Sequence, residues 1–295
     1  MKLLITGHHG QVGHALIQQA AAHNFQVAAY DRSGLDIANR AAVLQTVERE
    51  QPDVIINAAA YTAVDKAESE PAAAYAANAE GAENLARAAH AAGAAILHIS
   101  TDYVFNGQTK RPYLETDTPD PQAIYGRSKL AGEQAVQAAC PRHIILRTAW
   151  VFGEHGHNFV KTMLRLGRER DSLGVVADQS GAPTYAGHIA AALLHIAGRT
   201  QTENCPYGLY HFSGSPYTTW HGFAAEIFRR AAEQGILPRT RPLGFISTCQ
   251  SRYDFSVGRQ LSKGADTPVF NPARPSGTHN VLVSARHLPP TWRTP

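Results

Sequence analysis

Two side chains near the middle of the chain have the types and the spacing that proton transfer requires. Tyr125 and Lys129 stand four positions apart, so a helix would place both on one face. A free tyrosine has a pKa of about 10, but a neighbouring ammonium favours the phenolate and moves that pKa toward neutrality. The same lysine can donate hydrogen bonds to the ribose of a nicotinamide nucleotide. The pair predicts a catalytic proton donor, although an exposed Tyr and Lys on an ordinary helix would have the same spacing.

A glycine turn near the N-terminus has the spacing of a phosphate site. Gly7, Gly10 and Gly13 lie between an expected strand at 2–6 and an expected helix at about 11–23. Gly7 would allow a tight turn and Gly10 the close approach of a pyrophosphate. Gly13 would let the helix pack closely on the sheet, with the helix N-terminus facing the anion. The turn therefore predicts a dinucleotide site.

The residues that follow a second expected strand, at 25–30, help to determine which dinucleotide binds. Asp31 could accept hydrogen bonds from the adenosine ribose, which favours NAD. Arg32 follows at once and could contact a 2′-phosphate, which favours NADP. Since the two features oppose each other, the expected cofactor is NADPH or NADH.

Short apolar runs alternate with alanine-rich runs in the first half of the chain, which predicts a parallel sheet with helices on both faces. We expect an α/β protein with a Rossmann, doubly wound parallel sheet and a smaller C-terminal substrate domain. Residues 1–152 would form the dinucleotide domain, with a return of the chain near 185–198, and residues 153–295 would mainly bind substrate. The main expected elements are strands at 25–30, 53–57, 95–100, 143–148 and 208–212, and helices at 40–50, 71–92, 125–139, 159–170, 188–197 and 219–234.

Composition excludes several other classes of protein. The formal net charge is only +3, with no basic block, so a nucleic-acid partner is not expected. No apolar run approaches the roughly 20 residues of a membrane span, and the predicted location is the cytoplasm. Cys140, Cys205 and Cys249 are far apart and form no CxxC motif, so we expect neither disulfides nor a metal site.

Several longer stretches resemble a known family. The glycine turn and the Tyr–Lys pair are similar to those of extended short-chain dehydrogenase/reductases. More narrowly, STDYVFNG, RTAWVFG and DQSGAPT, at 100–107, 147–153 and 178–184, resemble segments of the dTDP-4-dehydrorhamnose reductases. The resemblance covers about residues 1–235. It implies NAD(P)H-dependent reduction of the 4-keto group of dTDP-4-dehydro-L-rhamnose to dTDP-L-rhamnose, so that the partner would be a nucleotide sugar.

The resemblance also implies roles for particular residues. Tyr125 would give a proton to the C4 oxygen, Lys129 would hold the nicotinamide ribose, and Thr101 would hydrogen-bond the substrate carbonyl. Asp102 and Trp150 match sugar-contacting positions. Cofactor contacts are implied for Tyr125 and Lys129 and for Gly7, Gly10, Gln11, Val12, Gly13, Asp31, Asp36, Ile37, Ala60, Tyr61 and Thr62, and Asn78 matches a residue that orders the active-site backbone.

The sequence also departs from the family pattern. About fifty C-terminal residues match it poorly, with Thr278 where a serine is expected. Ala15 and Gly187 stand where some relatives place magnesium-binding glutamates, so a monomer or weak homodimer without a metal bridge is expected. Two alternatives remain open: another sugar-nucleotide reductase or epimerase, and a non-catalytic NADP-binding regulatory subunit.

Overall fold

The chain folds around a parallel sheet. The computed structural model describes residues 1–237, apart from 110 and 203–204, together with 243–246 and 269–270. Its six-stranded sheet has the order β10-β5-β4-β3-β1-β2, and every neighbouring pair is parallel. The strands are β1 (Lys2–Thr6), β2 (Gln26–Tyr30), β3 (Val54–Asn57), β4 (Ala95–Thr101), β5 (His143–Thr148) and β10 (Gly208–His211).

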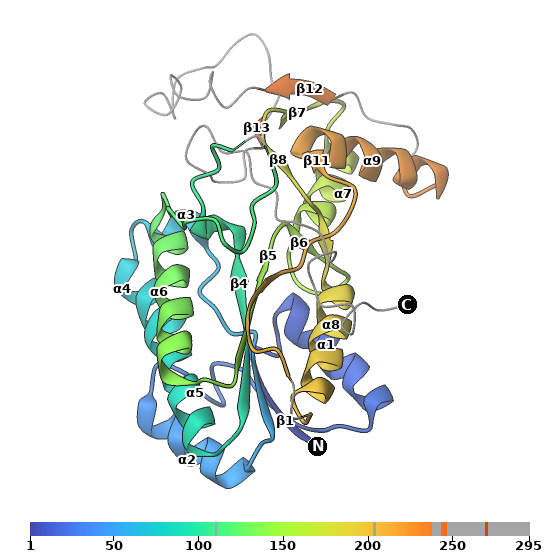
Figure 1. Ribbon diagram of the computed structural model, residues 1–295. Helices are drawn as coiled ribbons and strands as arrows, with labels where there is room; N and C mark the ends of the chain where they lie inside the picture. The colour runs from blue at the N-terminus through green and yellow to red at the C-terminus, as the bar shows by residue number, and fades with distance from the viewer. Residues whose placement is uncertain (110, 203–204, 238–242, 247–268, 271–295) are drawn as a thin grey trace.

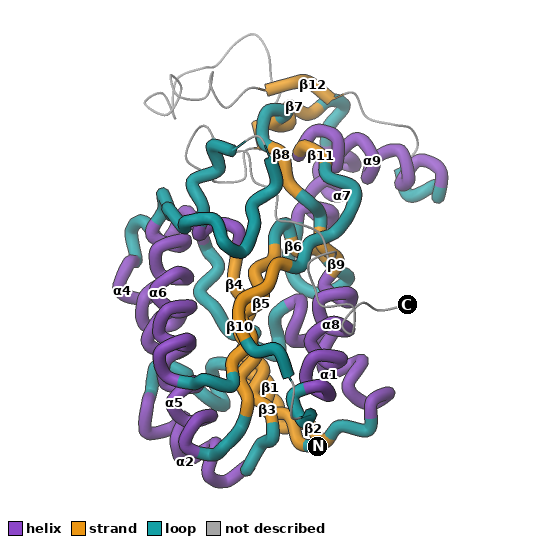
Figure 2. The backbone as a smooth tube through the Cα atoms, viewed as in Figure 1, coloured by secondary structure: helices purple, strands orange, loops and turns teal. Residues whose placement is uncertain are grey.

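Helices cover both faces of this sheet (Figures 1 and 2). Side chains alternate between the faces of a strand, so Leu3 and Ile5 pack toward one helical layer and Leu4 toward the other. The first layer contains α1 (Gln11–Ala20) and α8 (Ala186–Arg199), and the second contains α2 (Arg40–Glu50), α5 (Gly81–Ala91) and α6 (Ile124–Ala139). The predicted doubly wound α/β fold is confirmed.

The expected helix at 71–92 is present as an unbroken helical run from Pro71 to Ala91, but it is not α-helical throughout. The segment contains α4 (Pro71–Tyr75), a π-helical turn η2 (Ala76–Glu80) and then α5. Alanine favours helical backbone without distinguishing an α turn from a π turn, so the local pattern contains no sign of the extra residue. A π turn inside a helix is rare and often lies at a functional site.

After β5 the chain leaves the sheet and its helical layers, and it returns to them twice, first as α8 and then as β10. Helix α8 packs against α1, and β10 pairs with β5 at the edge of the sheet. The remaining elements after β5 form a second lobe, most of which lies in the upper part of Figure 1. They are β6 (Val151–Phe152), α7 (Phe159–Glu169), β7 (Leu173–Val176), β8 (Ser180–Gly181) and β9 (Thr184–Tyr185), followed beyond β10 by β11 (Thr218–Thr219), α9 (Trp220–Glu233), β12 (Leu243–Ile246) and β13 (Val269–Phe270).

The second lobe has a core of its own. Helices α7 and α9 pack together through Met163 and Phe228, which are fully buried, and both cover Val175 of β7. Strands β12 and β13 flank β7 in a parallel three-stranded sheet. Thr278 and the other residues of 271–295 lie outside the described residues. No helix in the described part of the chain is long and apolar enough to span a membrane.

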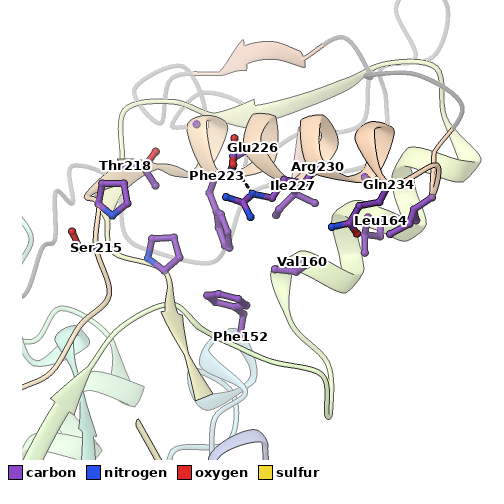
Figure 3. Close-up of a pocket in the computed structure, with 15 residues that line it drawn as sticks. Phe152, Val160, Leu164, Ser215, Thr218, Phe223, Glu226, Ile227, Arg230 and Gln234 are labelled. Atoms are coloured by element: carbon purple, nitrogen blue, oxygen red, sulfur yellow. Dashed lines mark hydrogen bonds and ion pairs between the residues drawn. The ribbon is translucent and has the colours of Figure 1, made fainter. Parts of the chain in front are cut away.

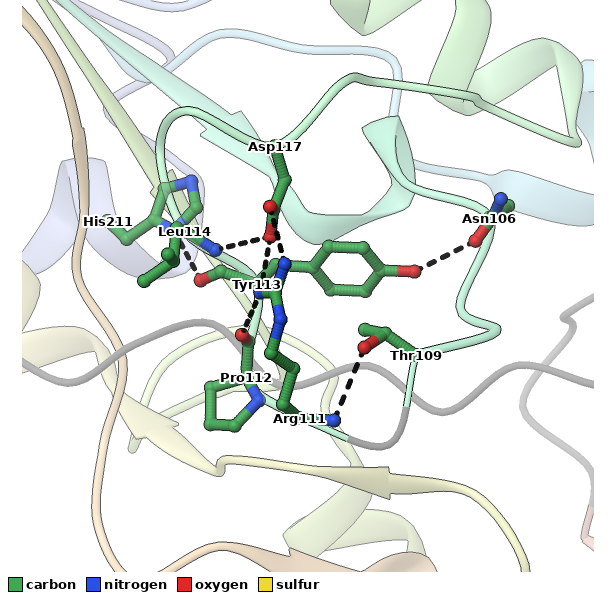
Figure 4. Close-up of polar contacts among 8 residues, drawn as sticks. All are labelled: Asn106, Thr109, Arg111, Pro112, Tyr113, Leu114, Asp117 and His211. Atoms are coloured by element: carbon green, nitrogen blue, oxygen red, sulfur yellow. Dashed lines mark hydrogen bonds and ion pairs between the residues drawn. The ribbon is translucent and has the colours of Figure 1, made fainter.

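The loop between β4 and α6 begins with a 3₁₀ turn, η3 (Asp102–Val104), and carries its own polar framework. Arg111 forms a two-pronged ion pair with Asp117, with both distances 2.7 Å (Figure 4). The Tyr113 ring stacks on Phe105 at 4.1 Å. The Tyr113 carbonyl lies 3.2 Å from Nδ1 of His211, at the end of β10. The framework therefore joins this loop to the edge strand of the sheet.

The stability of the fold should fall as the pH is lowered, because His211 is buried. Burial lowers the pKa of this side chain to about 4, so between pH 6.5 and 4 the unfolded chain binds a proton that the folded chain does not. We expect the free energy of unfolding to decrease by about 2 kcal/mol from pH 7 to pH 5 through this residue. Urea unfolding at the two pH values measures the loss. His211→Asn should show a smaller pH dependence, and an equal slope in both proteins would contradict the assignment.

Candidate active site

Two adjoining cavities lie across the carboxyl ends of the sheet strands. The loop cavity, about 720 Å³, is bounded by the segment 31–38 after β2. The tyrosine cavity, about 530 Å³, contains Tyr125 and Lys129. Both are lined by His9, Gly10, Ala58, Ala59, Ala60 and Thr62. Ligands of open α/β sheets bind at this edge, where the strand order reverses, as it does here between β1 and β3.

The glycine turn forms the floor that the two cavities share. Gly7 has φ +72°, and a Cβ there would lie 2.6 Å from the backbone nitrogen of Ala59. Gly10 is the N-cap of α1. Gly13 does not line either cavity but packs beneath the turn, where a Cβ would lie 2.2 Å from the Gly7 carbonyl oxygen. The backbone thus leaves room for a phosphate at a helix N-terminus, as a dinucleotide requires.

Gly13→Ala should weaken the binding of a nicotinamide dinucleotide. The added methyl group would meet the backbone of Gly7, so the turn itself must move. Isothermal titration with NADPH should show at least a tenfold loss of affinity, about 1.4 kcal/mol.

Gly198→Ala is the matched control for that substitution. It too lies in a helix, but nothing stands within 4 Å of its Cβ position. Alanine should stabilise α8 by roughly 0.5–1 kcal/mol and leave binding unchanged. Equal affinities for all three proteins would contradict the assignment of the turn.

The predicted Tyr–Lys pair lies at the start of α6. Tyr125 is 9 % exposed and Lys129 only 2 %, and both line the tyrosine cavity. The Lys129 ammonium donates to the Ile99 carbonyl at 2.7 Å. Burial lowers the pKa of Lys129 to about 8, while the charge of Glu133, one turn along the helix, acts in the opposite direction. A lysine of this kind can change its protonation state near neutral pH.

The loop after β4 adds a hydroxyl and a carboxylate to the same cavity. Thr101 Oγ1 accepts from the Tyr103 amide at 3.2 Å and donates to Asp102 at 3.1 Å. A Cβ at Gly126 would lie 2.2 Å from the Tyr103 carbonyl. The glycine after Tyr125 therefore allows this loop to pack on α6, which brings the predicted Thr101 and Asp102 beside the Tyr–Lys pair.

Trp150 also lines the tyrosine cavity. Its φ of +49° is uncommon for a large side chain. The indole stacks on Trp220 with ring centroids 3.6 Å apart. A Cβ at Gly181 would lie 2.3 Å from the same ring. The resemblance singles out both RTAWVFG and DQSGAPT, and the packing explains why they occur together: Gly181 in one motif makes room for Trp150 in the other.

Asn78 connects the cavity wall to α6. Its Oδ1 accepts from the Tyr61 amide at 2.8 Å, and its Nδ2 donates to the Tyr61 carbonyl and to Ser128 Oγ. Ser128 Oγ in turn donates to the Tyr125 carbonyl at 2.8 Å. The π turn directs the Asn78 carbonyl toward α6, where Gly132 has no side chain to meet it. This arrangement supports the backbone-ordering role that the resemblance implies for Asn78.

Of the implied cofactor residues, the loop cavity brings together Asp31, Asp36, Ile37 and Tyr61, and Arg32 lines it beside them. Gln11 and Val12 line the tyrosine cavity instead. Hydrogen bonds from Ser33 and Gly34 lower the pKa of Asp31, and the carboxylate also lies 3.1 Å from His9 Nδ1. His8, His9 and Asp31 place ligand-type atoms within 4.8 Å of one another, a grouping that the sequence did not indicate.

Sequence reasoning missed the buried polar side chains beneath the cavity. Asn57 and His98 are each 1 % exposed and hydrogen-bonded to each other. Glu133 and Arg147 form an ion pair with side chains 2 % and 3 % exposed. The available signal was the presence of polar residues inside otherwise apolar strands, such as His98 in the middle of β4. The partners lie on different elements, so spacing along the chain could not pair them.

A further cavity lies in the second lobe, and none of the predicted site residues lines it. It has a volume of about 480 Å³ and lies between α7 and α9 (Figure 3). Its lining is largely apolar and includes Phe152, Val160, Leu164, Phe223 and Ile227. The ion pair of Glu226 and Arg230 stands beside it. The predicted Tyr–Lys pair, Thr101, Asp102 and Trp150 all line the tyrosine cavity on the sheet edge.

The fold and the site together place the chain among the NAD(P)-binding Rossmann proteins, a class that includes reductases and epimerases. A solved structure of UDP-glucose 4-epimerase from Brucella ovis, in complex with NAD, has the same fold, with a TM-score of 0.71 at 19% identity over 91% of this chain and 88% of that one.

Closer comparisons identify the family within that class. The family model "RmlD substrate binding domain" matches residues 1–249. A dTDP-4-dehydrorhamnose reductase of Aggregatibacter actinomycetemcomitans is 48% identical over 249 residues, 84% of this chain and 85% of the relative. A crystal structure of dTDP-4-dehydrorhamnose reductase from Bacillus anthracis str. Ames in complex with NADP is 40% identical, with a TM-score of 0.79 over 85% of each chain. The chain belongs to this family, as the resemblance predicted.

Proposed function

We propose that this protein reduces the 4-keto group of dTDP-4-dehydro-L-rhamnose to give dTDP-L-rhamnose, with NADPH or NADH as the reductant. One observation carries the proposal: the Tyr–Lys pair and Thr101 line a single cavity that adjoins the glycine turn. Family membership and the names of the relatives support the same substrate.

The two cavities divide the tasks of the reaction between them. The glycine turn and the loop cavity would hold the dinucleotide, with Asp31 and Arg32 near its adenosine end. The nicotinamide supplies the hydride when it is bound. In the tyrosine cavity, Thr101 would hydrogen-bond the substrate carbonyl, and Asp102 and Trp150 would contact the sugar. The second lobe, within residues 153–295, would bind the rest of the substrate.

Tyr125 is the proton donor in this proposal. Its phenolic proton passes to the C4 oxygen as the hydride arrives, because the developing alkoxide is a strong base. The Lys129 ammonium stabilises the phenolate that remains. The near-complete burial of Lys129 strengthens this effect, since a charge in a water-poor site interacts more strongly with its neighbours.

The direct test follows the absorbance of NADPH, and separately of NADH, with dTDP-4-dehydrorhamnose supplied by the enzymes that make it. One molecule of cofactor should be oxidised for each dTDP-L-rhamnose formed. Formation of an epimer without net oxidation would favour the epimerase alternative. Tight NADPH binding without turnover of any sugar nucleotide would favour the regulatory subunit.

A further inference from the structure

A row of buried, hydrogen-bonded polar side chains leads beneath the sheet edge to Lys129. Thr6 on β1, Asn57 on β3 and His98 on β4 are each 1 % exposed, and these three strands are neighbours in the sheet. Thr6 Oγ1 lies 2.8 Å from Asn57 Oδ1, and Asn57 Nδ2 lies 3.0 Å from His98 Nδ1. His98 Nε2 then lies 3.4 Å from Lys129 Nζ.

The direction of these hydrogen bonds follows from one backbone amide. The N–H of Ala59 can only donate, and it points to Asn57 Oδ1 at 3.1 Å. The other end of the Asn57 amide, the donor Nδ2, must therefore face His98 Nδ1. Nδ1 accepts this hydrogen bond and has no proton of its own. A neutral imidazole then carries its single proton on Nε2, the nitrogen that faces Lys129.

His98 stays neutral in this position. Burial, with the Lys129 charge as a second cause, holds the pKa of His98 well below its usual value. An imidazolium would place a proton on Nδ1 and break the hydrogen bond from Asn57. The side chain therefore presents an N–H, and not a lone pair, to the lysine nitrogen.

An N–H directed at Nζ distinguishes between the two forms of Lys129. The amine has a lone pair that can accept this hydrogen bond, whereas the ammonium has three donors and no acceptor. Lys129 also faces Tyr125 and Glu133 on its own helix, and Asp102 and His157 line the same cavity. The Glu133 charge favours the ammonium, so the His98 proton acts against it and in the same direction as burial.

We propose that His98, held as the Nε2–H tautomer by Asn57, is a positioning residue that stabilises the amine form of Lys129. Insofar as Lys129 serves the reaction, the inference rests on the proposed function. After Tyr125 has given its proton to the substrate oxygen, the Lys129 ammonium can return a proton to the phenolate and become an amine. The Nε2–H of His98 then donates to that amine until the amine takes a proton from the solvent. The proton given to the substrate oxygen therefore comes from the solvent in the end, and the protein returns to its starting protonation state.

The tautomer can be observed in the cofactor-free protein. Long-range proton–nitrogen NMR of protein labelled with ¹⁵N-histidine separates a protonated ring nitrogen from an unprotonated one. We expect Nδ1 of His98 to be unprotonated and Nε2 protonated at neutral pH. A protonated Nδ1 would overturn the proposal, and this measurement requires no variant to fold.

Asn57→Asp tests the consequence for the lysine. A carboxylate at this position accepts a hydrogen bond, so His98 should move its proton to Nδ1 and present the Nε2 lone pair to Lys129. The titration midpoint of Lys129, followed by NMR of ¹³C-labelled lysine, should rise by about one pH unit, a tenfold change in the amine–ammonium equilibrium. A higher midpoint with Nε2 still protonated would indicate a charge effect alone and would contradict the proposal, as would an unchanged midpoint.

Thr6→Val is the matched control. It removes one hydrogen bond to Asn57 Oδ1 but leaves the Ala59 amide in place, so the orientation of Asn57 should persist. The tautomer of His98 and the midpoint of Lys129 should both match the wild-type protein, and a shift of either would contradict the inference. These readings do not depend on turnover. If the protein reduces no sugar nucleotide, the proposed function fails while the assignment of His98 still stands or falls by itself.

Discussion

Tyr125→Phe should lower turnover by roughly 10²–10⁴-fold, the range expected when a general acid is lost. The phenolic oxygen is the only atom removed, and the ring can keep its edge-on contact with Tyr103 at 5.3 Å between centroids. Binding of the dinucleotide, to which Tyr125 contributes one implied contact among many, should change much less than turnover. Single-turnover oxidation of NADPH and isothermal titration separate the two effects.

Tyr207→Phe controls for the loss of a hydroxyl. This phenol accepts from Arg142 Nε at 3.0 Å and lines neither cavity. The variant should keep wild-type turnover. If Tyr125→Phe were as active as the wild-type protein, another proton donor would have to be sought, with Thr101 the first candidate in the same cavity.

Glu133→Gln should destabilise the protein by roughly 3–5 kcal/mol, the usual cost of leaving a buried charge without its partner. Both Glu133 oxygens accept from Arg147, at 2.8 and 2.6 Å, and one also accepts from Ser100. An amide can accept at one end only, so its nitrogen would face the guanidinium. Arg147 would keep its stack on Phe105 but lose its counter-ion. Urea unfolding at neutral pH measures the difference.

Two further proteins show whether burial is the cause. Glu83→Gln breaks an ion pair with Arg87 whose side chains are 38% and 55% exposed, and it should cost less than about 1 kcal/mol. The double variant Glu133→Leu with Arg147→Met removes both buried charges and should recover much of the lost stability. If Glu133→Gln and Glu83→Gln lowered the free energy of unfolding by similar amounts, the buried ion pair would be no more important for stability than the exposed one.

Much of the sheet could be predicted from residues close together in the chain. The strand at 143–148 was predicted with the bounds that it has, because an apolar run between a helix and a turn is a local signal. The glycine turn and the spacing of Tyr125 and Lys129 are local for the same reason, since one turn and one helix hold each group. The family motifs added Thr101, Asp102 and Trp150, which the structure brings to one cavity.

Contacts between elements that are far apart in the sequence could be found only in the tertiary structure. Alanines favour a helix at 71–92, but the π turn depends on Asn78 bonding to Tyr61 and to Ser128 across the gap to α6. The tautomer of His98 likewise follows from an amide on the neighbouring strand. Local backbone preference depends on a few adjacent residues, whereas the proton state of a buried group depends on whatever packing places around it. The sequence by itself determined the sheet, the turn and the chemistry of the Tyr–Lys pair, and the tertiary structure decided the electrostatic surroundings in which Lys129 must act.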